Sequence, residues 1–400
     1  MPSDASDPAR GSTLVPKPIA KGVRGLALVF LSVCVLRGTA SQAGSAGSAG
    51  ANFLEFGQGP RAIGMGESQV AVAEDAYAAY WNPAGLAAVE HAQLALTYNK
   101  ALEGVDQQYI SLAYPLRQGS TLNLNFTRLG MSSFQGYDAQ GVQTKSVGAS
   151  DYALGAAYGR TLIADLAKRP VLNLGFNVKG IRESLDTESA SAFAVDLGAI
   201  AYWRPGRVRT VSSGQEWRLG LAAKNLGPGL KFDRDRSDLP SSYQIGLAWR
   251  GYPKGDSLTL SLDQVLSRDE PHYIAAGVEY VVLRTVALRL GYKTGQEVGS
   301  GFRAGAGFKL KVFDLDYAFA GFGDLGQMHR VGLSIRLAGP VEVTPPDDIA
   351  LEAILRKAAR LMSERRFYEA ILEYDKALDI DRGNTQALEG MKRANQALQP

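Results

Sequence analysis

The sequence predicts an all-β transmembrane barrel of about 14 antiparallel strands, followed by a small α-helical domain at the C-terminus. Between residues 93 and 337, about 14 segments alternate apolar and polar side chains, which is the period of a strand with one apolar face. Most segments have about 9–12 residues. Strands of globular proteins are commonest at about 5–6 residues, whereas a tilted strand needs about 9–11 to cross a bilayer. An export signal at the N-terminus is the third observation.

The overall composition excludes several classes of protein. The 400 residues include 43 Lys and Arg against 40 Asp and Glu, and a net charge of +3 is too low for a nucleic-acid binder with a broad basic surface. No apolar run reaches the roughly 18 residues of a membrane-spanning helix. A single Cys excludes a disulfide framework and a Cys-based zinc site. The 45 glycines indicate many turns, or strands that need small side chains.

Residues 1–43 have the order of a secretory signal peptide. Basic residues occur in the first 24 positions, a short apolar run follows at Gly25–Leu36, and small residues at 38–43 offer cleavage sites. An anchoring helix is the alternative, but the run has only about 12 residues and a spanning helix needs about 20. The leader holds five basic residues, two acidic residues and Cys34, so the mature chain has 38 residues of each sign and no cysteine. Such a chain suits an exported protein without disulfides.

Residues 44–92 are expected to form a flexible joint and a compact N-terminal hatch. The joint contains the low-complexity stretch Gly44–Gly50. The hatch, Asn52–Glu90, lacks the alternation of strands and contains a cluster of glycines. Their spacing fits neither a dinucleotide-binding loop nor a P-loop. Turns that fold a compact plug are the better interpretation.

Residues 93–338 are predicted to form the barrel. In one segment, Leu122 and Leu124 face one way, and Asn123 and Asn125 face the other. The predicted strands are 93–99, 107–115, 120–129, 149–160, 171–182, 190–203, 216–225, 241–250, 257–265, 272–282, 285–294, 301–311, 313–321 and 328–337. Glycine-rich stretches at 130–136 and 227–229 are where irregularity is expected.

The apolar face of the strands is expected to contact lipid, and the polar face to line the lumen. A soluble periplasmic β protein would have the opposite arrangement, and alternation alone does not separate the two. Aromatic residues near the segment ends favour the membrane, because girdles of Tyr and Trp lie at membrane interfaces. These residues are Tyr98, Tyr114, Tyr202, Trp203, Trp249, Tyr280 and Tyr292. We therefore predict a location in the cell outer membrane of a Gram-negative-type envelope.

Charged residues of both signs on the polar face are expected in the lumen. They are Asp263, Arg289, Lys293, Arg303, Lys309, Asp314, Asp316 and Arg336. One interpretation is a selectivity ring around a pore. The other, which we favour, is a salt-bridged filling in which the Arg and Lys residues pair with the three aspartates.

Four short motifs of the hatch carry a resemblance to a known family. They are Phe53-Leu54 with Gly57, then Arg61–Gly66, Ala73–Ala76 and Tyr80–Leu86. Together they resemble the opening of the PorV/PorQ family, which belongs to the FadL-like superfamily of outer-membrane barrels. The resemblance implies a 14-stranded barrel with the N-terminal segment tucked inside. It identifies as hatch-motif residues Gly64, Met65, Gly66, Asp75, Asn82, Pro83, Ala84 and Gly85.

The resemblance implies two candidate functions. PorV-like proteins act in type IX secretion, where they bind the C-terminal signal of exported cargo and carry it to the attachment complex. FadL-like proteins are passive channels for hydrophobic molecules. We predict that this chain binds exported proteins or scaffolds an envelope or secretion complex. Transport of hydrophobic small molecules across the outer membrane is the alternative.

The chain departs from both groups in a predicted helical domain at residues 349–400, after a Pro-rich linker at 339–348. Its second helix resembles that of a tetratricopeptide repeat. The residues expected to pack are Ala358, Leu361, Phe367, Ala370, Tyr374 and Ala377. The domain is either a docking surface, which we favour, or a solubilising cap. Because an even number of strands leaves both chain ends on one side of the barrel, we expect it in the periplasm.

No constellation of residues indicates catalysis. The three histidines, His91, His272 and His329, lack metal-binding spacing, and neither H-E-x-x-H nor G-x-S-x-G occurs. Asp314 and Asp316 share one strand face, but nearby Lys and Arg make them better ion-pair partners. We therefore expect no enzyme activity, no metal and no cofactor. The expected partners are outer-membrane lipid, a periplasmic or secreted protein, and alternatively a hydrophobic small molecule, but no nucleic acid.

Overall fold

The computed structural model describes residues 49–398 except 101–103, 138–139, 166–167, 187, 206–214, 233–234, 254–255, 297–298, 324–325, 338–345 and 382–383. The predicted signal peptide, most of the joint and most of the predicted linker lie outside the described residues. The hatch and the three C-terminal helices lie within them.

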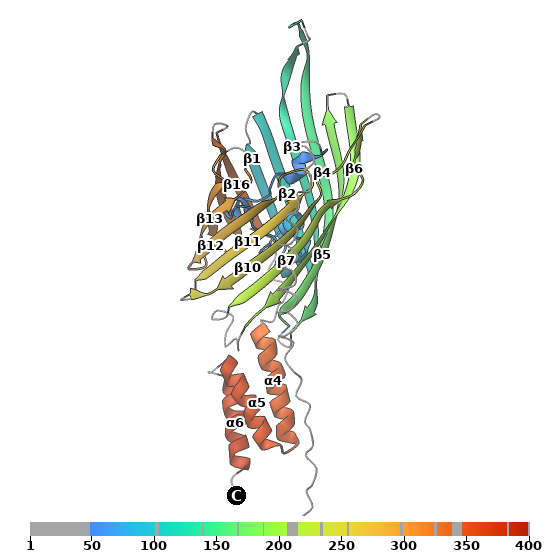
Figure 1. The fold of residues 1–400 in the computed structure, drawn as a ribbon. Coiled ribbons are helices and arrows are strands. Elements are labelled where there is room, and N and C mark those ends of the chain that lie inside the picture. The colour runs from blue at the N-terminus through green and yellow to red at the C-terminus, as the bar shows by residue number, and fades with distance from the viewer. Residues whose placement is uncertain are drawn as a thin grey trace, which may run out of the picture. The chain divides into compact units, whose positions relative to one another are not determined.

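Fourteen antiparallel strands close into a barrel (Figure 1). The first strand pairs with the last, with Gln93 opposite Arg336, so the barrel has one end at which the first strand begins and the last strand ends. We call this the terminal end. The predicted fold class is confirmed. The barrel strands are β1 (Gln93–Lys100), β2 (Val105–Arg117), β3 (Ser120–Tyr137), β4 (Gln143–Ala164), β5 (Pro170–Leu185), β6 (Glu188–Trp203), β7 (Glu216–Leu226), β10 (Ser242–Gly251), β11 (Ser257–Ser267), β12 (Tyr273–Val282), β13 (Val286–Lys293), β14 (Phe302–Lys309), β15 (Phe313–Gly321) and β16 (Gln327–Arg336).

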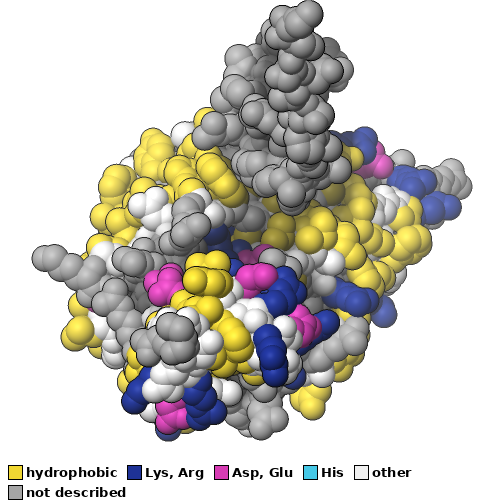
Figure 2. Space-filling model, turned by 90° about the horizontal axis from the view of Figure 1, so that it is seen from below, with side chains coloured by type: hydrophobic (Ala, Val, Ile, Leu, Met, Phe, Trp, Pro, Cys, Tyr) yellow, Lys and Arg dark blue, Asp and Glu magenta, His cyan; other side chains and the backbone are white. Residues whose placement is uncertain are grey.

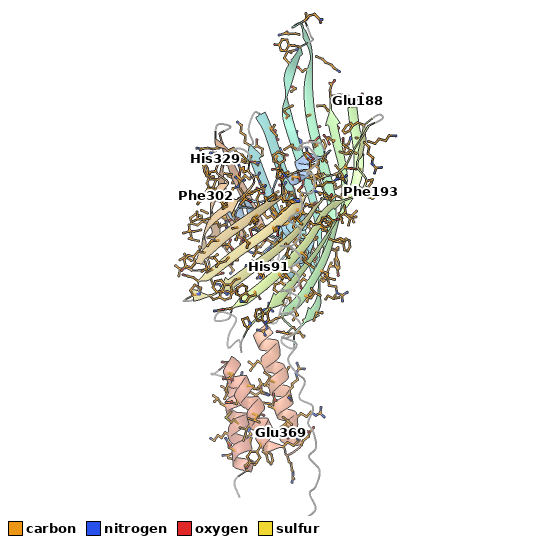
Figure 3. The ribbon with its side chains drawn as sticks, in the orientation of Figure 1. His91, Glu188, Phe193, Phe302, His329 and Glu369 are labelled. Carbon is orange, nitrogen blue, oxygen red and sulfur yellow. The ribbon has the colours of Figure 1, made fainter. Side chains whose placement is uncertain are left out.

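The apolar side chains of the wall point outward and the polar ones point inward. On β3, Leu124 is 60% exposed, whereas Asn123 and Asn125 are buried. Figure 2 shows hydrophobic side chains gathered over the barrel wall. Phe193 and Phe302 lie on the outside of the wall (Figure 3) and are both exposed. A closed barrel with an apolar outer face and a polar interior has the surface of a transmembrane barrel, because lipid contacts its outside.

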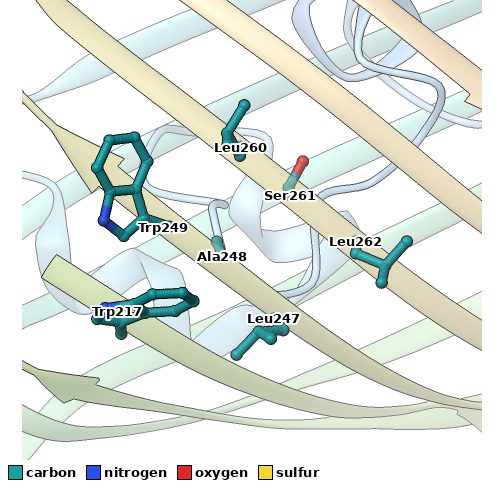
Figure 4. Close-up of a pocket in the computed structure, with 7 residues that line it drawn as sticks. All are labelled: Trp217, Leu247, Ala248, Trp249, Leu260, Ser261 and Leu262. Atoms are coloured by element: carbon teal, nitrogen blue, oxygen red, sulfur yellow. The ribbon is translucent and has the colours of Figure 1, made fainter.

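Tryptophans form a cluster on the outer wall near the terminal end. Trp217 on β7 lies opposite Trp203 on β6 and opposite Trp249 on β10. Trp217 and Trp249, together with Leu247 and Leu260, line an apolar groove of about 390 Å³ (Figure 4). Because these leucines belong to the outward-facing set of side chains, the groove faces lipid and not the lumen.

One predicted member of the aromatic girdle, Tyr202, faces the lumen instead. It is buried, and the guanidinium carbons of Arg204 and Arg218 lie 5.4 and 5.3 Å from its ring centroid. Successive residues of a strand point to opposite faces, so Tyr202 points inward where Trp203 points outward. The predicted girdle residues that are exposed on the wall include Tyr98, Tyr114, Trp203 and Tyr292.

Strands β3 and β4 are longer than predicted and form a two-stranded ribbon beyond the other strands (Figure 1). Pairing with β2 stops at Met131, and pairing with β5 starts at Ala149. The ladder between β3 and β4 shifts register between Met131 and Phe134. This shift lies within residues 130–136, where the sequence predicts an irregularity.

The second predicted irregularity, residues 227–229, is where the chain leaves β7. It then forms a separate small hairpin of β8 (Leu230–Phe232) and β9 (Asp235–Ser237). Leu230 is fully buried in one apolar cluster with Phe53 and Leu54 of the hatch. The hairpin therefore supports the start of the hatch and leaves the barrel closed.

The hatch folds into four short helices inside the barrel. They are η1 (Asn52–Glu55), α2 (Pro60–Gly64), α3 (Ala78–Trp81) and η2 (Pro83–Ala88). Proline opens α2 and η2, where its missing N–H group would have no helical partner anyway. Helix α2 packs against β13 to β16 and η2 against β3 to β6. These strands are on opposite sides of the barrel, so the hatch crosses the lumen.

Glycines of the strands make room for the hatch backbone. Gly159, Gly175 and Gly198 lie side by side on β4, β5 and β6. A Cβ atom at these positions would lie 2.0–2.7 Å from atoms of Asn82 or Pro83. Side-chain carbons do not approach other atoms this closely, so these positions require glycine. We call these three residues the glycine wall. They show that strands, and not only turns, account for the high glycine content.

The C-terminal helices form a domain with its own core. They are α4 (Pro346–Ser363), α5 (Phe367–Ile380) and α6 (Thr385–Ala397). Ala358, Ala370 and Ala387 are fully buried where the helices meet. Helix α4 begins at Pro346, so the predicted linker at 339–348 ends too late; proline is favoured in the first turn of a helix. Among the described helices, none has the length and apolar character that would let it cross a membrane.

We expect the Gly175→Ala substitution to destabilise the barrel, because the new Cβ would lie 2.3 Å from the backbone of Pro83. Overpacking of this kind costs about 1–3 kcal/mol, so the detergent-solubilised protein should unfold at a lower temperature. Gly180→Ala on the same strand is the matched control, since no atom lies within 4 Å of its Cβ position. Equal unfolding temperatures for the two variants would contradict the role of the glycine wall.

Candidate functional site

The candidate site is the interface between the hatch and the barrel wall, and Asn82 is at its centre. The fully buried Asn82 side chain accepts a hydrogen bond at Oδ1 from the Ala84 nitrogen, at 3.1 Å. Its Nδ2 donates to the Val70 oxygen at 2.7 Å and to the oxygens of Ala199 and Leu221, each at 3.2 Å. One side chain therefore caps η2 and connects the hatch to β6 and β7.

The residues after Asn82 allow a close approach. Pro83 lies against the glycine wall, and Ala84 packs in one cluster with Ile200. A Cβ atom on Gly85 would lie 2.1 Å from the oxygen of Ala73. The Asn-Pro-Ala-Gly motif therefore combines a polar anchor with small residues that bring two stretches of backbone into contact.

Gly64, Met65 and Gly66 make a similar contact on the opposite wall. Gly64 lies over Gly305, whose Cα atom is 3.0 Å from the position of a Gly64 Cβ. A Cβ on Gly291 would lie 1.9 Å from the Gly66 nitrogen, and Gly66 has a φ of +68° that favours glycine. Met65 is fully buried. The motif therefore brings the hatch backbone into contact with β13 and β14.

Ten charged residues link the hatch to the wall in one connected set, which we call the Glu74 network. Glu74 Oε2 lies 2.9 Å from Arg218 Nη1 and 2.8 Å from Arg250 Nη1. Arg61 Nε lies 3.0 Å from Glu279 Oε2, and its Nη2 lies 3.5 Å from Glu74 Oε1. The members are Arg61, Arg204, Arg218, Arg250 and Arg289 with Glu74, Asp75, Glu216, Glu279 and Asp316. Five cations thus face five carboxylates.

Asp75, a predicted hatch-motif residue, belongs to this network. Its Oδ2 lies 3.6 Å from Arg61 Nη1, and its Oδ1 accepts a hydrogen bond from the Tyr77 nitrogen at 2.9 Å. Asp75 therefore holds the turn that leads into α3 and adds one negative charge beside Arg61.

Two of the predicted ion pairs between lumen residues are present. Arg289 Nη1 lies 2.6 Å from Asp316 Oδ1, and Arg336 Nη2 lies 2.6 Å from Asp314 Oδ2. Lys309 is opposite Asp314 in the register of β14 and β15.

Other predicted lumen charges have partners in the hatch instead. Lys293 Nζ lies 3.0 Å from Glu67 Oε2, and Arg303 Nη2 lies 3.8 Å from Glu67 Oε1. The expected pairing of Asp263 with a cation is wrong: its Oδ2 accepts a hydrogen bond from the Val70 nitrogen at 2.8 Å. The reason is that the hatch backbone lies over this part of the wall and presents an N–H group to the carboxylate.

Three hatch residues that form these ion pairs, Arg61, Glu67 and Glu74, were not among the predicted charge partners. Their signal is a few charges in a segment that is otherwise apolar and rich in glycine, which is typical of buried pairing. The wall partners Arg218 and Arg250 were not predicted either. Both occupy inward positions of their strands, so the alternation of side chains could have identified them.

A small polar cavity lies between the hatch and strands β7, β10, β11 and β12. It measures about 20 Å³, and its lining includes Glu55, Glu67, Lys224 and Tyr273. The Lys224 ammonium lies 3.7 Å from the ring centroid of Tyr80. A cavity of this size holds a water molecule, so it is too small to bind a hydrophobic ligand.

The predicted packing residues of the helical domain lie largely in its core. Ala358, Leu361, Ala370, Tyr374 and Ala377 are buried together. Phe367 is only half-buried, because it is the first residue of α5 and lies at the edge of the domain.

The surface of the helical domain carries exposed apolar residues. Tyr368 and Leu372 on α5 are 74% and 61% exposed, and their spacing of four residues places them on one side of the helix. Beside them, burial would raise the pKa of Glu373, but hydrogen bonds from Lys376 and Lys357 hold this pKa below its usual value. This patch is a candidate surface for a partner.

The arrangement of hatch and wall is that of a plug. The hatch backbone contacts glycines of the wall on two opposite sides of the barrel. The Glu74 network connects the hatch to the strands between these two sides. Within the described ranges, no group of three His, Cys, Asp or Glu residues could hold a metal ion.

We expect Glu74→Gln to loosen the hatch, because Arg218 and Arg250 lose their shared carboxylate. Removing one partner of a buried ion pair typically costs about 3–5 kcal/mol. A cysteine introduced at the fully buried Ala79 should then react with a maleimide at least about tenfold faster, since about 1.4 kcal/mol is a factor of ten. Glu188→Gln is the control, because Glu188 is exposed (Figure 3). Equal labelling rates would show that the network does not hold the hatch.

A family model and a relative match the sequence of this chain. The sequence model of the family described as Type IX secretion system protein PorV matches residues 40–250. The UPF0164 protein of Treponema pallidum (strain Nichols) is 25% identical over 387 residues, which cover 90% of this chain and 88% of that protein.

Among solved structures, the toluene transporter TbuX of Ralstonia pickettii aligns with a TM-score of 0.48 and 13% identity, over 70% of this chain and 97% of TbuX. A FadL homologue of Pseudomonas aeruginosa aligns with a TM-score of 0.39 and 12% identity, over 70% and 98% of the two chains. The family match spans more than half of the sequence and includes the whole hatch. This chain, an outer-membrane β-barrel with an internal hatch, belongs to the PorV family.

Proposed function

We propose that this protein binds exported proteins or scaffolds an envelope or secretion complex at the outer membrane, without catalysing a reaction. The observation that carries the proposal is the plugged lumen. Ion pairs and glycine contacts fix the hatch across the barrel, which leaves the barrel ends and the helical domain as surfaces for partners. The description of the family, a protein of the type IX secretion system, supports the same role.

The proposed location of the helical domain is the periplasm. Gln93, the first residue of β1, pairs with Arg336, the last residue of β16. The hatch therefore leads into the first barrel strand at the terminal end. The chain also leaves the last barrel strand at this end. We infer that this end faces the periplasm, because the exported chain reaches the membrane from that side.

The proposed contact surface is the exposed apolar side of α5. Tyr368 and Leu372 are exposed although the domain has a well-packed core of small residues. Exposed aromatic and aliphatic side chains on one helix face are typical anchors of protein interfaces. The resemblance to a tetratricopeptide repeat, which commonly presents a binding surface, supports this assignment.

The alternative function, passive transport of hydrophobic molecules, has less support. Toluene transport is stated for TbuX. Among the described residues, one cavity between hatch and wall is polar and measures about 20 Å³. The apolar groove at Trp217 and Trp249 is on the outer wall (Figure 4). A hydrophobic substrate requires an apolar path between hatch and wall, so we favour the interaction role.

We expect deletion of residues 349–400 to abolish the recovery of exported proteins or envelope components that are cross-linked to the barrel in cells. In the full chain, Tyr368→Ser combined with Leu372→Ser should lower this recovery at least about tenfold, since the loss of interface anchors costs about 2 kcal/mol or more. Quantitative mass spectrometry of the cross-linked complexes measures the effect.

Glu369→Gln is the matched control, because Glu369 is an exposed residue of the same helix (Figure 3). It should leave the recovery unchanged. If the deletion variant retains the same partners in the same yield, the helical domain is not the binding surface.

A further inference from the structure

A second group of buried charges, which we call the Glu67 cluster, is unbalanced in sign. It contains Glu67 of the hatch, Lys293 on β13, Arg303 on β14 and Arg330 on β16. Lys293 and Arg303 lie 3.0 and 3.8 Å from the two carboxylate oxygens of Glu67. Arg330 also interacts electrostatically with Glu67, and it lies near enough to Arg303 to be repelled by it. In the part of the chain that the structure describes, three cations thus share one carboxylate.

The two guanidinium groups of the cluster are buried, and three of their nitrogens lack an acceptor. Arg303 is 3% exposed and Arg330 is 4% exposed. Among the described atoms, Nε and Nη1 of Arg303 and Nε of Arg330 have no hydrogen-bond partner. The other nitrogens of Arg330 donate to the oxygen of Gly57 and to the sulfur of Met328. A buried N–H group without an acceptor is unfavourable, and more so when it carries charge.

The wall beside these donors is apolar. Strand β15 lies between the two arginines and places Ala320 opposite Arg303 and Ala318 opposite Arg330. Both alanines are buried, and a methyl group accepts no hydrogen bond. The ring of Phe322 lies 5.2 Å from the guanidinium carbon of Arg303. Strand β15 therefore supplies neither an acceptor nor a negative charge for the three nitrogens without partners.

The Glu74 network shows the contrast. Its five arginines face five carboxylates, and each arginine has at least one ion pair. Water can supply an acceptor to a buried N–H group but cannot neutralise a cation. The Glu67 cluster therefore needs a negatively charged group with several acceptor atoms.

We propose that the Glu67 cluster binds a small oxyanion, a phosphate or a carboxylate, between Arg303 and Arg330. The oxygens of such an anion accept hydrogen bonds from the three nitrogens without partners, and charge-assisted hydrogen bonds of this kind are strong. A doubly charged phosphate, together with Glu67, neutralises the three cations. Arg303 and Arg330 lie near the first residues of β14 and β16, at the end of the barrel away from the terminal end. The anion thus fixes the hatch at that end.

Inorganic phosphate should stabilise the purified full-length protein. The measurement is the unfolding temperature in detergent at rising phosphate concentration, with ionic strength held constant by chloride, and again with acetate as the carboxylate probe. We expect a rise that saturates, as binding to the folded state requires. Arg303→Gln should weaken the apparent affinity at least about tenfold, because a hydrogen bond to a charged group is lost. An unchanged affinity in this variant would overturn the proposal.

Arg128→Gln is the matched control, since Arg128 is a partly exposed wall residue paired with Asp106. It should leave the response to the anion unchanged. Arg330→Gln tests the same site from β16 and serves if the Arg303 variant fails to fold. Equilibrium dialysis of phosphate against the unaltered protein gives a readout that does not depend on stability.

The phosphate series and the acetate series show which class of anion the Glu67 cluster binds. A response to phosphate alone indicates a phosphate site, and a response to acetate alone indicates a carboxylate site. No saturable response to either anion overturns the proposal.

Discussion

The structure depends on direct contact between the backbone of the hatch and the backbone of the barrel wall. At the glycine wall no side chain separates the two, so Asn82 and Pro83 lie on the strands themselves. Asn82 then donates to the oxygens of Ala199 and Leu221. A carbonyl oxygen in a sheet ladder still has a second lone pair, so it accepts this extra bond without breaking the ladder. The motif thus supplies an amide for the wall, a proline to begin the turn and two small residues for close approach.

Buried charges complement this contact in a different way. A buried ion pair contributes little net stability, because desolvation offsets the attraction, but an unpaired buried charge is strongly unfavourable. We therefore infer that the Glu74 network favours one position of the hatch in the lumen over other positions. Arg218, Arg250 and Glu279 belong to three different strands, so a hatch displaced in any direction leaves at least one of them without its partner.

The barrel could be predicted from the sequence because a period of two persists along each strand. The predicted segment 257–265 corresponds to β11 (Ser257–Ser267), for example. The partner of Asp263 could not be predicted, because inward residues meet the hatch, and the path of the hatch is not contained in the strand pattern. Tyr202 shows a second limit: its position near a strand end suggested a girdle, whereas its parity in the strand places it inside. The use of glycine became clear only from the register, which brings Gly175 beside its counterparts on two other strands.

The order of the chain gives the hatch a consequence for biogenesis. The hatch precedes β1, and the seam of the cylinder forms between β1 and β16. A barrel that closed without the hatch would leave four arginines of the wall with only three carboxylates of the network, because Arg61, Glu74 and Asp75 arrive with the hatch. Closure of the seam and insertion of the hatch are therefore best achieved together. Assembly machinery that handles this chain has to accommodate the hatch before the last hairpin docks.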